Sequence, residues 1–110
     1  MSRIKVLSMS EHNYKLSIRM GGSIPLGSSL RVVLEPPSKS KIVITDDSVV
    51  SIGEVDAMDA KGVVLAGSYI DLLVRKGLFY EAGAWVIKGV VEGQDGKVTI
   101  GPKIKFIVRG

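Results

Sequence analysis

Short stretches of alternating apolar and polar residues, each ended by a turn signal, most limit the folds open to this chain. Residues 14–20 show the pattern clearly, because Leu16, Ile18 and Met20 fall on one side of an extended chain. A pair of glycines follows at once, and the next alternating stretch, residues 29–35, stops at a pair of prolines. Alternation with a period of two predicts half-buried β-strands rather than helices.

Further strand signals recur along the chain, separated by turns. They lie at residues 3–9, 41–45, 49–58 with a break at Gly53, 63–65, 84–92, 98–100 and 103–109. Residues 69–76 fit either one or two helical turns or an extended segment. Asp95-Gly96 is the dipeptide favoured in type I′ hairpin turns, so we expect the chain to end in an antiparallel pair.

The composition favours the same reading, since valine and isoleucine number 26 of 110 residues against 5 alanines. Seven to nine short strands without a long helix predict an all-β protein, either a β-sandwich or a small OB-like β-barrel. The length suits one domain, which we take to span residues 1–110.

Cysteine is absent and histidine occurs once, as His12, which limits the chemistry open to the chain. No disulfide, thiolate nucleophile or Cys-type metal centre can form, and a histidine-rich metal site is excluded. The aspartates 46, 47, 56 and 59 are too sparse for a calcium loop and suit turns. We therefore expect no catalytic residue, no cofactor and no metal site.

The charges fall into three blocks, and the net charge of +4 conceals them. Residues 1–45 carry a net +5, residues 46–81 a net −4, and residues 82–110 a net +3. Such a chain can bind nucleic acid weakly through its basic parts, or copies of it can associate head to tail. The remaining interpretation is that these charges are the solvated faces of strands.

The alternation also separates candidate core residues from candidate contact residues. The apolar side of the strands supplies the core anchors Trp85, Phe106, Ile104, Leu30, Val32 and Leu34. The outward side is more apolar than a solvated face needs, and it supplies candidate subunit contacts. These are Val33, Val86, Lys88, Val90, Lys103, Lys105 and Ile107.

Three segments occur together in an order that resembles a known family. They are the glycine-bearing turn and crossing at residues 16–26, the strand and proline turn at residues 30–39, and the tryptophan strand with its Asp-Gly-Lys hairpin at residues 82–97. This order is similar to the small immunoglobulin-like β-sandwich proteins of tailed-phage particles, found among tail, baseplate and neck components. The resemblance covers roughly residues 14–110, implies an immunoglobulin-like antiparallel sandwich, and transfers no catalytic residue.

The resemblance leads to the expectation of a non-enzymatic virion structural subunit that self-associates and binds neighbouring particle proteins. The N-terminal residues lack the apolar core of a signal peptide, and no stretch approaches a membrane span, so we expect a virion protein assembled in the host cytoplasm. Two alternatives stay open. One is a nucleic-acid-binding OB-like subunit of a transcription or replication complex. The other is a carbohydrate-binding module, which needs a solvent-exposed aromatic platform and which an exposed Trp85 would favour.

Overall fold

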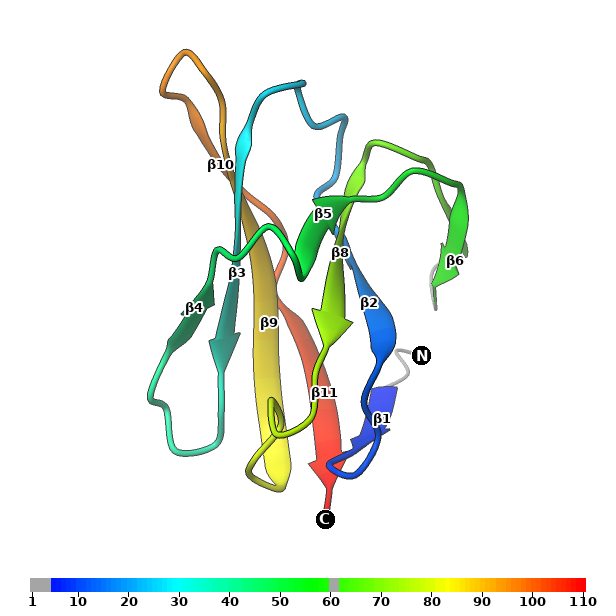
Figure 1. Cartoon of the computed structure of the whole chain (residues 1–110), viewed down its shortest axis with the longest axis vertical. Helices are drawn as coiled ribbons and strands as arrows, with labels where there is room; N and C mark the ends of the chain where they lie inside the picture. The colour runs from blue at the N-terminus through cyan, green and yellow to red at the C-terminus, as the bar shows by residue number, and fades with distance from the viewer. Residues whose placement is uncertain (1–4, 60–61) are drawn as a thin grey trace.

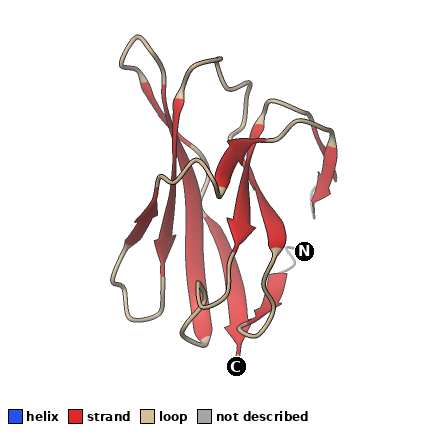
Figure 2. Ribbon diagram, viewed as in Figure 1, coloured by secondary structure: helices blue, strands red, loops and turns tan. Residues whose placement is uncertain are grey.

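The computed structural model describes residues 5–59 and 62–110, and within them the regular structure is all strand (Figures 1 and 2). The strands are β1 (Lys5–Ser8), β2 (Tyr14–Arg19), β3 (Ser29–Glu35), β4 (Ile42–Ile44), β5 (Val50–Ile52), β6 (Ala57–Asp59), β7 (Gly62–Val64), β8 (Tyr69–Val74), β9 (Gly83–Glu92), β10 (Val98–Ile100) and β11 (Ile104–Arg109). None of the described residues forms a helix that could span a bilayer.

The strands form two sheets and a separate hairpin. The six-stranded sheet has the order β1-β11-β9-β3-β4, and β10 pairs with the far end of β9. The three-stranded sheet has the order β2-β8-β5, and β6 pairs only with β7. Figure 1 shows β2, β8 and β5 layered over the larger sheet, with β6 standing away from both layers at one side.

The core lies between the two sheets. Each strand sends every second side chain inward, so that Ile18 and Ile70 from the smaller sheet meet Val32 and Trp85 from the larger one. Gly89 makes this approach possible, because a Cβ there would lie 2.6 Å from the Met20 Sδ and 2.9 Å from the Ile70 Cδ1. The prediction of an all-β, immunoglobulin-like β-sandwich is confirmed, and the alternative OB-like barrel is not what forms.

Two ambiguous stretches resolve into strands and connections. The segment that fitted helix or strand is β8, because it lies in the middle of the smaller sheet between β2 and β5 and makes its ladder hydrogen bonds there. The predicted strand over residues 49–58 breaks at Gly53 into β5 and β6. Gly53 is buried with Tyr69 packed across it, and a Cβ there would lie 1.9 Å from the tyrosine ring.

Two features at the margins of the larger sheet were not predicted from the sequence. The β9–β10 connection is not a two-residue type I′ turn, which needs two positive φ angles, because only Gly96 has one (82°). Hydrogen bonds from the Gly93 amide to the Lys97 carbonyl and from the Gly96 amide to the Gly93 carbonyl close a longer loop instead. At the opposite edge β1 pairs with β11 in parallel, so the larger sheet is mixed. Of the predicted strand at residues 3–9, residues 3 and 4 lie outside the described residues.

Candidate interaction surface

The predicted core anchors all come from the larger sheet. Trp85, Phe106, Val32 and Leu34 are buried, whereas Leu30 and Ile104 are half-buried and pack against the margin of the core. Phe106 lies opposite Trp85 in the β11–β9 ladder, with ring centroids 6.4 Å apart and an angle of 22° between the rings. The Trp85 Nε1 donates a hydrogen bond to the Glu81 carbonyl at 2.8 Å, so burial leaves no polar atom of the indole without a partner.

The predicted contact residues belong to the other side of the same sheet, which we call the outer face. The strand register brings them into rows that cross the sheet. One row is Glu35, Val86 and Lys105, the next is Val43, Val33 and Lys88, the third is Arg31, Val90 and Ile100, and the fourth is Ser29, Glu92 and Val98. Ile107 extends the outer face on β11, where its neighbour in register is Val6 of β1. Lys103 is exposed directly before β11.

The outer face combines exposed apolar side chains with a surplus of positive charge. Val43 is 56% exposed and Ile100 is 61% exposed, and Val6 and Val98 are also exposed. Val33, Val86 and Ile107 are half-buried, and Val90 is buried by its neighbours in register. The basic side chains Arg31, Lys88, Lys103, Lys105 and Arg109 outnumber Glu35 and Glu92, which gives the face a net charge of +3.

A second exposed apolar surface lies on the hairpin of β6 and β7 and the residues that flank it. We call this segment the arm, and its described residues are 54–59 and 62–66. Val55, Val63 and Leu65 are 69%, 58% and 63% exposed. The sequence of residues 54–66 contains three acidic residues and one lysine, so the arm carries a net charge of −2. The arm therefore has the opposite charge to the outer face.

The base of the arm is held by hydrogen bonds to the smaller sheet and within itself. The Gly53 amide donates to the Tyr69 carbonyl at 2.9 Å, and the Gly67 amide donates to the Gly53 carbonyl at 2.8 Å. The Tyr69 hydroxyl donates to the Val55 carbonyl at 2.6 Å, and the Ala66 amide donates to Asp56 Oδ1 at 2.9 Å. Burial raises the pKa of the Tyr69 phenol above its ordinary value, and the nearby Asp71 carboxylate adds to the rise. These contacts fix the point at which the arm leaves the sheet.

The groups considered for metal binding or catalysis do not gather in one place. His12 is exposed, and its Nδ1 lies 3.2 Å from the Ser10 carbonyl oxygen. Asp46 Oδ1 accepts hydrogen bonds from the Ser48 amide and hydroxyl, which lower the pKa of that carboxyl. Asp56 ties the base of the arm, and the side chain of Asp59 is outside the description. Across the described residues, no three His, Cys, Asp or Glu side chains lie together.

An open hollow of about 250 Å³ lies beside β4 and β8, and it does not resemble a catalytic pocket. Its walls are mainly apolar, and its two charged residues are Asp46 and Arg75. Both charged side chains hydrogen-bond Ser48, and Arg75 does so at 3.3 Å. Their hydrogen bonds therefore stabilise the β4–β5 loop.

Sequence reasoning found most of the outer face but missed the arm. Val43, Val98 and Ile100 lie in predicted strands and were not recognised as exposed, because alternation alone does not tell an edge strand from a central one. The arm had one local signal, the glycine at position 53 between two apolar runs. The contact of that glycine with Tyr69 is visible only in the folded chain.

Comparisons with known proteins place the fold but not a family. No protein-family model and no curated protein matches the chain. Among solved structures, the chain is similar to CopC from Methylosinus trichosporium OB3b, with a TM-score of 0.53 and 16% sequence identity over 97% of this chain and 84% of that one. At this identity the likeness shows the β-sandwich fold alone.

The expectation of a virion structural subunit is wrong by this comparison. It depended on the immunoglobulin-like fold, and a solved structure that shares this fold is CopC, which is not a phage-particle protein. The expected particle proteins and virion location depended on that interpretation. The OB-like alternative fails because the chain forms a sandwich. The carbohydrate-binding alternative loses the support that an exposed Trp85 would have given, because Trp85 is fully buried. No ligand or role of CopC carries over to this chain, because a likeness at this identity shows the fold alone.

Proposed function

We propose that this chain is a non-enzymatic protein-binding domain, and that the outer face of its larger sheet is the binding surface. The observation that carries the proposal is the group of exposed apolar side chains on that face, with basic side chains around them. The side of a sheet that faces water is expected to carry mostly polar side chains. The outer face instead carries valine and isoleucine on β4, β9, β10 and β11.

The physical basis is the pairing of apolar area with charge at its margin. Burying the exposed valine and isoleucine side chains against a partner stabilises a complex by about 25 cal/mol per Å² of apolar area removed from water. The lysines and Arg31 add electrostatic complementarity to an acidic partner, which governs the association rate and the choice of partner more than the affinity.

Site-directed photocrosslinking tests the proposal. One variant carries a photoreactive amino acid in place of Val43 on the outer face, and a matched control carries it in place of Ser51, which is exposed on β5 of the smaller sheet. In extracts of the cells that make the protein, we expect discrete protein adducts from position 43 and not from position 51. Adding Lys105→Glu to the Val43 variant should reduce them, because it reverses one charge of the surface.

Equal adduct formation from positions 43 and 51 would contradict the proposal, since the outer face would then have no preference for a partner. Adducts from position 43 that do not change with Lys105→Glu, or with replacement of the apolar residues on the outer face, would contradict it as well. Folding of each variant is checked by the fluorescence of Trp85, the single tryptophan of the chain.

A further inference from the structure

Two exposed apolar surfaces of opposite charge occur on the same molecule. The outer face carries a net +3 around Val43 and Ile100, and the arm carries a net −2 around Val63 and Leu65. Both surfaces expose apolar side chains, and their net charges have opposite signs. A partner that covers the outer face should offer exposed apolar side chains and carboxylates, and the arm of a second copy offers both.

The base of the arm is held in place before the arm meets a partner. Its base is held by the four hydrogen bonds that join Gly53, Val55, Asp56, Ala66 and Gly67 to one another and to Tyr69. A segment that is already fixed loses less conformational entropy on binding than a free loop does. The exposed Val55 and Leu65 side chains flank β6 and β7 on this fixed base.

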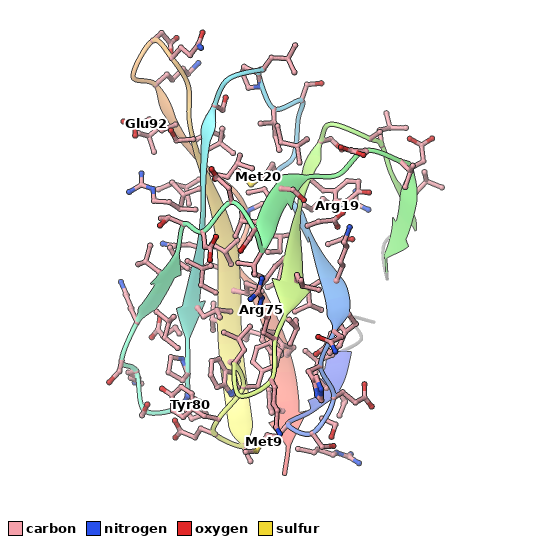
Figure 3. All side chains as sticks on the ribbon, viewed as in Figure 1. Met9, Arg19, Met20, Arg75, Tyr80 and Glu92 are labelled. Atoms are coloured by element: carbon pink, nitrogen blue, oxygen red, sulfur yellow. The ribbon has the colours of Figure 1, made fainter. Side chains whose placement is uncertain are left out.

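A single molecule cannot join its own arm to its own outer face. The arm leaves from the smaller sheet and stands at one side of the molecule, whereas the outer face is the side of the larger sheet turned away from the smaller one (Figures 1 and 3). Val43 and Leu65 are both exposed within one chain, so neither surface covers the other. The pairing therefore requires two copies, and each copy keeps one arm and one face free.

We infer that the partner of the outer face is a second copy of this chain, whose arm docks on it so that copies associate head to tail. This inference rests on the proposed function and names the partner. Because the two surfaces in the contact differ, the interface is heterologous, and repeating it produces a ring or an open chain rather than a closed pair.

Complementation between two variants tests the inference. The arm variant is Glu54→Lys with Leu65→Lys, which leaves the Asp56 hydrogen bond at the arm base intact. The face variant is Val43→Glu with Lys105→Glu. By sedimentation velocity we expect the unchanged protein to form species larger than a dimer as its concentration rises, and each variant alone to remain a monomer. We expect a mixture of the two to form a 1:1 dimer that does not grow, because only one intact arm and one intact face can meet.

A matched control separates the outer face from a general effect of charge. Lys15→Glu with Ser51→Glu makes the same change in charge as the face variant, at exposed positions of the smaller sheet. This control should associate like the unchanged protein. The face variant should raise the dissociation constant about tenfold or more. Added salt should also raise the dissociation constant of the unchanged protein, because it screens the charges of the two surfaces.

Three results would overturn the inference. An arm variant that still dimerises alone would mean that two outer faces pair with each other. An arm variant and face variant that do not combine would remove the arm as the partner of the face. Unchanged protein that stays monomeric into the millimolar range would exclude a second copy as the partner, and crosslinks from position 43 to another protein would then preserve the proposed function. Trp85 fluorescence and unfolding curves confirm that each variant folds.

Discussion

The inner and outer faces of the larger sheet come from the same strands and have different surroundings. Along β9, Trp85 and Ile87 point inward and are buried under the smaller sheet, whereas Val86 and Lys88 point outward and remain half-buried. Both sides of the strand are rich in apolar residues. The difference teaches that burial depends on a covering layer, and this molecule supplies one layer for two apolar faces.

The largest effect should come from removing the anchor of the inner face. Trp85→Ala deletes a fully buried ring that packs edge-on against Phe79 at 5.2 Å, so we expect a loss of about 3–5 kcal/mol in the free energy of unfolding. Urea denaturation followed by circular dichroism measures it, since the variant has no tryptophan to report. A loss below about 1 kcal/mol would mean that the inner face is not the stabilising side of the sheet.

A smaller effect should follow from filling the space at Gly89 on the inner face. Gly89→Ala places a Cβ within 3 Å of the Met20 Sδ and the Ile70 Cδ1, so we expect a loss of about 1–3 kcal/mol in stability. Adding Met20→Ala removes the nearer atom, and the double variant should lose less stability than the sum of the two single variants. Additive losses would show that the two sheets do not meet at this glycine.

Tyr69 sharpens the comparison, because it is an outward residue of the smaller sheet that is buried under the base of the arm. Tyr69→Phe removes the hydrogen bond to the Val55 carbonyl, and we expect a loss of about 1 kcal/mol together with faster amide exchange in residues 53–67. Unchanged exchange at the base of the arm would contradict a role for this bond in fixing it.

The Tyr69 phenol also predicts a pH dependence. Its pKa is raised in the folded chain by burial, so the folded state holds this proton more tightly than the unfolded state. The corresponding stability is fully present below the unfolded pKa near 10, and it is lost as the pH rises through the folded pKa. The pKa of Tyr14 is raised as well, and Tyr14 is present in both the unchanged protein and Tyr69→Phe. The loss of stability at alkaline pH should therefore be shallower in Tyr69→Phe than in the unchanged protein, as measured by urea midpoints.

The smallest effect on stability should come from the outer face. Val43→Ala shortens an exposed side chain on an edge strand, and we expect a change within about 0.5 kcal/mol. The same variant should weaken the self-association measured by sedimentation. A variant that loses several-fold more stability than this, with association unchanged, would mean that Val43 serves the fold rather than a contact.

Most strands could be predicted from the sequence because their signals are local. Alternation and the turns that follow it predicted the bounds of β2 and β3 to within a residue or two, as residues 14–20 and 29–35. Residues 69–76 could not be assigned, because their apolar positions suit a helix as well as a strand, and the decision came from ladder hydrogen bonds to β2 and β5 far away in sequence.

The candidate site divides in the same way. Alternation identified Val33, Val86 and Lys88 as outward residues, but the rows they form depend on the pairing of β9 with β3 and β11. The arm was missed, because its exposure results from Tyr69 packing across Gly53 and diverting the chain away from β5. Neither fact has a signal within a few residues of the positions concerned.

The amino-acid sequence by itself determined the strand content, the all-β class and the two apolar sides of the central strands, since a period of two is a property of the extended backbone. Tertiary structure alone decided which apolar side is covered. The smaller sheet closes over Trp85 and Ile87, with Gly89 giving room for its side chains, and leaves Val43 and Ile100 in water. The physical reason is that burial is a property of two surfaces in contact, and one strand's sequence specifies only one of them.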